Sequence, residues 1–414
     1  MKELGLIIDL NQPLVNEESV IKRSITDFYN PLARLLKSYK NISFSLNIPL
    51  STLELWEKHG ASGLISDFKD MYQSEKVELI NSSPYGLSLS GLPGKAIESQ
   101  LIFNEYGIGY YLGSRQGFEG EPSIMIKDVT GFLPAFNNLD SSVLNVLFDF
   151  EYSWFAIKNP FLKEYLFEIN DEGRVIKGVN IIDSINEIIS NLVIGDNGHI
   201  NSENLDKHIF EELGNVFKNI YTDENSSGVV RLGFKNDEVI PDLNYKNLFR
   251  VYESVLDTFS KMFDQVKNVS EIMKFKNKLK IYTPNEFIDL MKKNYVKEEK
   301  DDKFLKHVLE KLFNTADNII PISLNVINDN DLSSIKLWDL EHIKELNNTH
   351  IINNTCHLLL LSKLVPLLRL KDCKYYNEDE SLNNILREEI RVCVSNLLSY
   401  IDDIEIIGLL KSED

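Results

Sequence analysis

Two carboxylates two residues apart, Asp149 and Glu151, stand in the apolar segment at residues 147–155 (LFDFEYSWF). In a β-strand both side chains point to the same face, roughly 6–7 Å apart along the backbone. Paired carboxylates are what glycoside hydrolysis requires, one beside the anomeric carbon and one to protonate the leaving oxygen. Tyr152 and Trp154 offer aromatic rings on which sugars can stack. An alternating strand with two hydrated carboxylates has the same pattern, so both interpretations stay open.

Short apolar runs alternate with helical periodicity over the first two thirds of the chain. Runs typical of strands lie at residues 4–10, 42–48, 77–83, 123–129, 147–155, 228–235 and 278–282. Between them, apolar residues recur at helical spacing; one such face is formed by Leu205, Ile209, Leu213, Val216 and Ile220. Continuously apolar strands joined through helices predict a parallel sheet covered by helices. The α/β pattern therefore predicts a (β/α)7-type barrel with parallel strands.

The barrel domain is predicted to cover residues 1–295. An excursion at about 161–204 interrupts it, with turn sequences at residues 170–173 (NDEG) and 195–198 (GDNG). A helical C-terminal domain at 296–414, packed on the barrel, is predicted to follow. Its last clear helix is expected near residues 382–401.

In a parallel barrel, functional groups collect at the carboxyl ends of the strands. Besides the pair above, this rule selects polar residues that follow the predicted strands: Asp9, Asn11, Gln12, Asn47, Asn81, Ser82, Tyr85, Lys127, Asp128, Lys235, Asn236, Asp237 and Glu238. The seven histidines have no metal-ligand spacing, and no glycine-rich phosphate loop follows a strand. We therefore expect no metal and no cofactor.

Composition limits the partners. The chain has 414 residues, of which 43% are hydrophobic, and a formal net charge of −19. Such a charge argues against nucleic acid or an anionic membrane as the main partner, because both need a positive footprint. The cysteines, Cys356, Cys373 and Cys393, have no disulfide or zinc spacing. Without a signal-peptide pattern or an apolar run long enough to cross a bilayer, we expect a cytoplasmic protein. The oligomeric state is not predicted.

Several segments resemble the motifs of glycoside hydrolase family 57, especially its short α-amylase-like members. IIDLNQPLV resembles the first motif, which ends in His-Gln-Pro, and VELINSSPYGLSLSGL resembles the region that leads into a Tyr-Tyr-His-Ser turn. LFDFEYSW falls where the family has a Gly-Ile-Leu-Ala-Glu strand with its nucleophile. VVRLGFKNDE falls at the Asp-Tyr-Glu strand that supplies the general acid. KLKIYTPNEFI and THIINNTCHLLLLSK resemble the later motifs, and this order holds over nearly the whole chain.

The resemblance implies a role for each matching position. Glu151 would be the nucleophile, and His357 would be the C-terminal motif histidine. Asn11 and Gly86 replace the first two motif histidines, and Gly233 stands at the acid position. Because general acid catalysis contributes orders of magnitude in rate, its loss implies weak or no hydrolase activity. Substrate contacts are expected from Asn11, Gln12, Tyr85, Tyr152, Trp154 and His357.

Three functions follow from these patterns. The first is an α-amylase-like protein of carbohydrate metabolism that binds an oligo- or polysaccharide, such as an α-glucan, with little hydrolysis. The second is an active retaining glycosidase or glucanotransferase, with Glu151 and a relocated acid among Asp149, Asp237 and Glu238. The third is a non-catalytic structural or interaction protein on the same barrel. A second carboxyl about 5–5.5 Å from Glu151 would favour the active enzyme.

Overall fold

A computed structural model describes residues 3–12, 14–92, 94–113, 129–182, 184–186, 188–189, 202–220, 227–233, 244–274, 279–294, 360, 363–364, 366–367, 370 and 380–398. Within these ranges one sheet runs in the order β10-β6-β7-β5-β4-β3-β2-β1-β8, and β9 pairs with β1. Every neighbouring pair is parallel except β6 and β7. None of the described helices is long and apolar enough to cross a membrane.

The strands are short, and most are followed by a helix. They are β1 (Glu3–Asp9), β2 (Phe44–Asn47), β3 (Val77–Asn81), β4 (Gly131–Phe132), β5 (Trp154–Ile157), β6 (Leu166–Asp171), β7 (Arg174–Asn180), β8 (Ser227–Gly233), β9 (Val266–Lys267) and β10 (Lys280–Tyr282). The helices are α1 (Glu18–Ser24), the π-helical turn η1 (Ile25–Tyr29), α2 (Asn30–Ser38), α3 (Leu50–Lys58), α4 (Ser62–Gln73), α5 (Gly94–Leu112), the 3-10 turn η2 (Ala135–Asn137), α6 (Ser141–Asp149), α8 (Ser202–Ile220), α9 (Tyr245–Met262), α10 (Val269–Lys274), α11 (Pro284–Asn294) and α17 (Glu380–Leu398).

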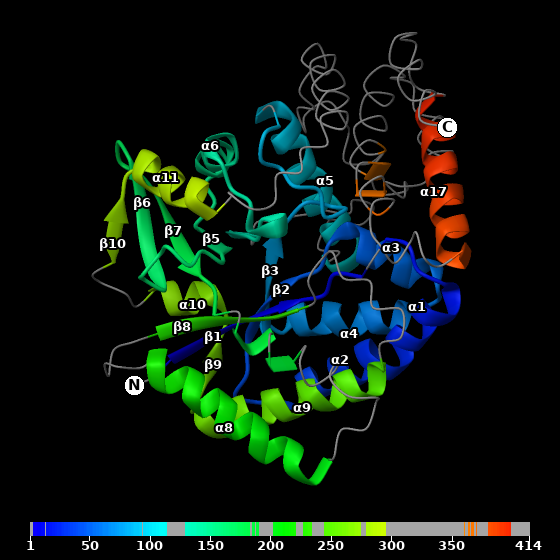
Figure 1. Ribbon diagram of the computed structural model, residues 1–414, viewed down its shortest axis with the longest axis horizontal. Coiled ribbons are helices and arrows are strands. Elements are labelled where there is room, and N and C mark those ends of the chain that lie inside the picture. Colours follow the sequence, from blue (N-terminus) through cyan, green and yellow to red (C-terminus); the bar gives the residue numbers. More distant parts are fainter. Residues whose placement is uncertain are drawn as a thin grey trace, which may run out of the picture.

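The predicted fold class is confirmed, since the mostly parallel sheet curls into a half-barrel with helices around it (Figure 1). Successive strand residues point to opposite faces. On the convex side, Leu6 and Ile8 pack in the core with α1 to α4, α8 and α9. At the other end of the sheet, α5, α6 and α11 cover the same side.

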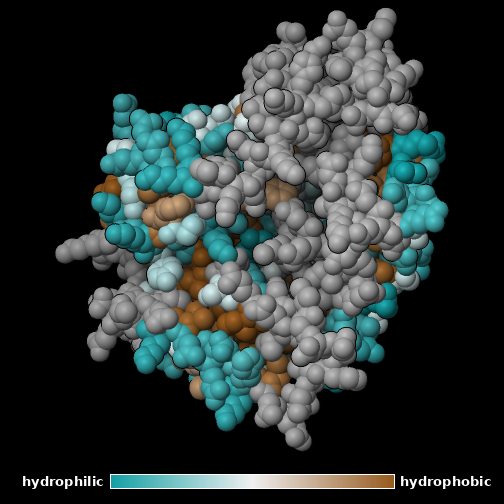
Figure 2. All heavy atoms as spheres, viewed as in Figure 1, coloured by the Kyte–Doolittle hydropathy of each residue, from teal (hydrophilic) through white to brown (hydrophobic). Residues whose placement is uncertain are grey.

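The concave side is closed at the amino ends of the strands by α10. Ile7 of β1 and Trp154 of β5 belong to one buried cluster with Val269 and Ile272 of this helix. Lys177 of β7 donates to a backbone carbonyl at the end of the same helix, 3.0 Å away. Figure 2, viewed as in Figure 1, shows hydrophobic residues gathered in the hollow around β8 and α10. Apolar side chains and α10 therefore fill the concave side at the amino ends of the strands, and another group of inward-facing polar residues lies at the carboxyl ends.

One strand prediction is wrong, and a second falls almost wholly outside the described residues. Residues 147–155 do not form a strand, because residues 141–149 are the helix α6 and only residues 154–157 are β5. Asp140 caps this helix by accepting from the backbone N–H of Val143 at 3.0 Å, and capping of this kind stabilises a helix start. The fourth strand is β4 at residues 131–132, and residues 123–128 of the predicted segment lie outside the described ranges.

Most of the other predicted strands and helices are present in the structure. Strands occupy the remaining predicted segments, and α8 buries Leu205, Ile209 and Leu213 as expected. The turn sequence at residues 170–173 joins β6 to β7 in a hairpin, whereas residues 195–198 lie outside the described residues. α17 confirms the last predicted helix, although Ile401 is not described. The domain boundary at residue 295 stays a prediction.

Candidate functional site at the carboxyl ends of the strands

The carboxyl ends of β1, β2 and β8 bring three polar side chains together, Asp9, Asn47 and Arg231. The Asp9 carboxylate accepts from Arg231 Nε at 2.9 Å and from Arg231 Nη2, and it also accepts from Asn47 Nδ2 at 2.8 Å. The side chain of Asp9 is 1% exposed and that of Arg231 13%. A buried carboxylate has to be paired and hydrogen-bonded, and both oxygens of Asp9 have such partners.

Gly233 lies beside this ion pair as the register partner of Asp9. A Cβ atom on Gly233 would come within 2.6 Å of Asp9 Cβ and 3.0 Å of the Asp9 backbone oxygen. Asn186 fixes the strand end, because it accepts from the Gly233 N–H at 3.3 Å and donates to the Arg231 carbonyl at 2.9 Å. Gly233 is the position that the motif resemblance assigned to the general acid. With the two strands in their present positions, there is no room for a side chain there.

This layer carries little that could transfer a proton. Among the described residues that face inward at the carboxyl ends of β1 to β5, β7 and β8, Asp9 is the one carboxylate, and Arg231 already pairs with it. Glycoside hydrolysis by two carboxylates needs a separate acid and a nucleophile or base. The described part of the layer does not bring such a pair together.

Asn11 and Gln12 follow β1, as predicted. Gln12 is 2% exposed, and its backbone N–H donates to the Thr52 hydroxyl at 2.9 Å, while its side-chain oxygen accepts from Ser24 at 3.1 Å. Gln12 thus ties the strand end to α1 and α3. Asn11 is half-buried. It follows Leu10, which packs in the convex core.

Asp149 and Glu151 lie elsewhere. Asp149 ends α6 and accepts from Arg174 at 2.9 Å on the exposed surface. Glu151 is exposed in the turn before β5, where its φ is +56°. Both carboxylates therefore stand at the amino end of β5, at the opposite edge from the inward polar layer. Their catalytic role, which depended on a strand through residues 147–155, has no support from this placement.

Tyr152 and Trp154 are buried and already have partners. The Tyr152 hydroxyl donates to Glu105 at 2.5 Å and accepts from Asn81 at 2.6 Å, and the side chain is 4% exposed. The Trp154 indole donates to Ser270 at 3.0 Å, and only 1% of the residue is exposed. These rings pack inside the protein, so the prediction that they stack on a sugar is not supported.

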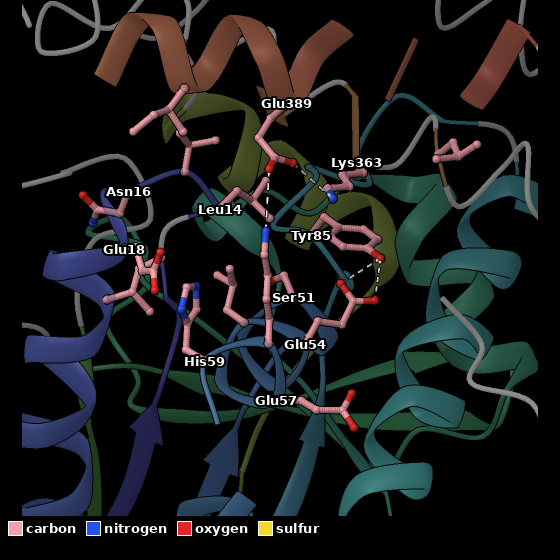
Figure 3. Close-up of a pocket in the computed structure, with 16 residues that line it drawn as sticks. Leu14, Asn16, Glu18, Ser51, Glu54, Glu57, His59, Tyr85, Lys363 and Glu389 are labelled. Carbon is pink, nitrogen blue, oxygen red and sulfur yellow. Dashed lines mark hydrogen bonds and ion pairs between the residues drawn. The ribbon is translucent and has the colours of Figure 1, made fainter. Parts of the chain in front are cut away.

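Tyr85 instead reaches a cavity of about 770 Å³ between α1, α3, α17 and the described residues near 360 (Figure 3). Its hydroxyl donates to both carboxylate oxygens of Glu54, at 3.0 and 3.2 Å. Above them, Glu389 of α17 forms ion pairs with Lys363 at 3.7 Å and with Lys58 at 3.9 Å. The cavity therefore lies beside the carboxyl ends of β1 to β3, where α17 meets the barrel helices.

Burial perturbs the titrating groups of this cavity. Desolvation raises the pKa of Glu54 to about 7, although Lys363 and the Tyr85 hydroxyl act in the opposite direction. It lowers the pKa of His59, with a further contribution from the neighbouring Lys58. Perturbed carboxyl groups in a cleft are typical of functional sites, although structural pairs show them too.

Three predicted site residues cannot be placed. Asp237, Glu238 and His357 lie outside the described residues. Across the described ranges, no three His, Cys, Asp or Glu side chains come together as a possible metal site. No cofactor site is assigned.

Arg231 and Glu54 were not among the residues predicted from the sequence. The sequence did contain a sign of Arg231, because it is the one charged residue within an apolar strand segment (VVRLG). Glu54 had none, because its surroundings come from distant segments. The segment at residues 131–135 (GFLPA) was missed as well. It contains β4, the neighbour of β3 in the sheet.

No protein-family model matches the chain, and no curated protein matches it. Solved structures do. A GH57-type branching enzyme from the archaeon Pyrococcus horikoshii matches with a TM-score of 0.57 at 10% identity, over 95% of this chain and 96% of that one. A GH57 branching enzyme from Thermococcus kodakaraensis, in complex with glucose, gives 0.56 and 10%, over 100% and 94%. A 4-alpha-glucanotransferase from Thermococcus litoralis gives 0.55 and 11%, over 88% of this chain and 58% of that enzyme. The chain thus has the fold of the GH57 (β/α)7-barrel enzymes.

Proposed function

We propose that this chain is a saccharide-binding relative of the GH57 barrels, which binds an oligo- or polysaccharide such as an α-glucan and has weak or no hydrolase activity. The fold of known glucan-processing enzymes supports the ligand class. Fold alone does not carry catalysis, so the activity has to be argued from the site.

One observation carries the loss of hydrolysis. At the inward carboxyl-end layer, Asp9 is held by Arg231 and Asn47, and Gly233 leaves no space for an acid beside it. An ion-paired carboxylate that is 1% exposed is poorly placed to meet a glycosidic oxygen. Removal of a general acid or nucleophile lowers rates by orders of magnitude. The active-enzyme alternative keeps Glu151 as nucleophile and needs a relocated acid among Asp149, Asp237 and Glu238, of which Asp237 and Glu238 lie outside the described residues.

The test is to measure binding and turnover on the same sample of the full chain. We expect maltohexaose to bind in titration calorimetry, while no new reducing ends form over many hours. Asn11→Ala should weaken this binding, because Asn11 is a half-buried polar residue in the segment that directly follows the carboxyl end of β1.

Two results would contradict the proposal. Hydrolysis that is lost in the double variant Asp237→Asn/Glu238→Gln would establish the active enzyme with a relocated acid. Failure to bind any member of a glycan panel would favour the structural or interaction protein. Glu151→Gln serves as a matched control. It should change neither glycan binding nor turnover, because Glu151 is exposed at the amino end of β5.

A further inference from the structure

The cavity beside Tyr85 has the size and lining of a ligand site. Its volume of about 770 Å³ lies within the range of small-molecule pockets, roughly 300–1,000 Å³. Its walls come from the segment after β1, from α3, from the loop after β3 and from α17. Apolar side chains form part of the lining, namely Leu14, Val15, Ile21, Leu55, Leu360 and Ile385.

The charges of this cavity are largely neutralised within the protein. Glu389 pairs with Lys58 and Lys363, and Glu18 pairs with Lys22 at 2.5 Å. Glutamates outnumber lysines in the lining, which disfavours phosphorylated or other anionic ligands. The pairing of most of these charges also leaves little attraction for an organic cation. A neutral polar ligand fits this balance best.

One hydrogen-bond acceptor in the cavity wall, the carboxyl group of Glu54, is incompletely used. A carboxylate offers about four acceptor sites, and among the described residues Glu54 receives hydrogen bonds from the Tyr85 hydroxyl only. Buried polar groups are normally hydrogen-bonded. Glu54 lines the cavity, so a ligand with hydroxyl donors would use its remaining acceptor positions.

From these features we infer that the cavity between α1, α3 and α17 is a second ligand site, separate from the inward layer of the strands. Its ligand is a neutral, hydroxyl-rich molecule of the size of a short oligosaccharide. Glu54, oriented by Tyr85, accepts from the ligand's hydroxyl groups, while the apolar wall covers its C–H faces. The choice of a saccharide rests on the proposed function, whereas the neutral, donor-rich character rests on the cavity itself.

Titration calorimetry of the full chain with maltotriose provides the test. At about pH 8, where Glu54 is ionised, we expect two binding steps, of which Glu54→Gln weakens one by about 10- to 100-fold through loss of charged hydrogen bonds. Asn11→Ala should weaken the other. If Glu54→Gln leaves both steps unchanged, the second site is wrong. If Glu54→Gln removes the one step observed and Asn11→Ala has no effect, the second site stands and the barrel site of the proposed function fails.

A second pair of variants removes the dependence on Glu54. Ile385 lines the cavity from α17, whereas Val392 lies on the same helix and is 42% exposed. Ile385→Trp fills the cavity and should abolish the Glu54-dependent step, and Val392→Trp should leave it intact. Loss in both variants, or in neither, would overturn the inference.

Discussion

At the scale of single residues, the Asp9–Arg231 pair is the strongest constraint on the site. Removal of one partner of a buried pair leaves an uncompensated charge and typically costs about 3–5 kcal/mol. We therefore expect Arg231→Met to lower the free energy of unfolding by about this amount in urea titrations. The double variant Asp9→Asn/Arg231→Met should recover much of the loss, since no charge is then left buried.

The exposed pair between Arg174 and Asp149 provides the control. Their side chains are 48% and 59% exposed, and surface ion pairs contribute little because water and salt screen them. Arg174→Met should change the free energy of unfolding far less than Arg231→Met. If the two substitutions had equal effects, the buried Asp9–Arg231 pair would contribute no more to the free energy of unfolding than an exposed pair.

Glu54 predicts a pH dependence of stability. Burial raises its pKa from the usual 4.5 to about 7, so between these values the folded protein holds a proton that the unfolded chain has released. Stability from this group is therefore fully present below pH 4.5 and is lost as the pH rises towards 7. Glu54→Gln does not titrate, and its free energy of unfolding relative to the wild type should rise by roughly 2–3 kcal/mol between pH 5 and 7.5.

Glu18→Gln is the control for this titration. Glu18 lines the same cavity, but the hydrogen bond from Lys22 lowers its pKa. Its carboxyl group therefore titrates below the pH range in which Glu54 titrates. The difference between Glu18→Gln and the wild type should stay constant from pH 5 to 7.5. A constant difference for Glu54→Gln as well would contradict the raised pKa.

At the scale of elements, most strands could be predicted from the sequence, because a short, continuous apolar run between helices is typical of a buried strand. It failed at residues 147–155 because Asp-Phe-Glu-Tyr alternates like a strand, while Val143, Leu144, Leu147 and Phe148 follow a helical face and Asp140 caps it. Periodicity over a short window does not separate the two cases. The two-residue strand β4 is too short to leave a pattern at all. The strand predicted at residues 147–155 put Asp149 and Glu151 near a carboxyl end, whereas the structure has them at the amino end of β5.

The docking of α10 under the strands depends on Glu78 of β3. Its carboxylate accepts from the Ser45 hydroxyl at 2.6 Å, the Ser270 N–H at 3.3 Å and the Trp154 indole at 3.3 Å. Glu78→Gln replaces one acceptor oxygen by a donor and leaves part of these donors unpaired. We expect a loss of about 1–3 kcal/mol in the free energy of unfolding, measured in urea.

Glu168→Gln on β6 makes a suitable comparison. This side chain is also half-buried, but it has no hydrogen-bond partner among the described residues. The substitution should therefore have little effect on unfolding. If Glu78→Gln is equally silent, the carboxylate does not anchor α10 to the sheet.

At the scale of the whole molecule, the order of the motifs predicted the fold better than any single motif predicted a role. A barrel needs only apolar strands and amphipathic helices in sequence, and both leave periodic patterns. The ion pair joins Asp9 and Arg231, which are 222 residues apart in the sequence. In the cavity, Glu54 and Tyr85 are 31 residues apart. No local pattern encodes such contacts. The site is therefore the part that sequence reasoning reached least.

The net charge of −19 acts on the whole chain. Like charges on the surface repel one another in the compact state, and the repulsion is released on unfolding. Added salt screens it over about 10 Å at 0.1 M. We expect the midpoint of thermal unfolding to rise as NaCl increases from about 10 to 200 mM, most steeply at the lowest concentrations. The buried Asp9–Arg231 pair is little screened, so Arg231→Met should keep the same salt dependence at a lower midpoint. A midpoint that falls with salt would mean that attractive surface pairs outweigh the repulsion.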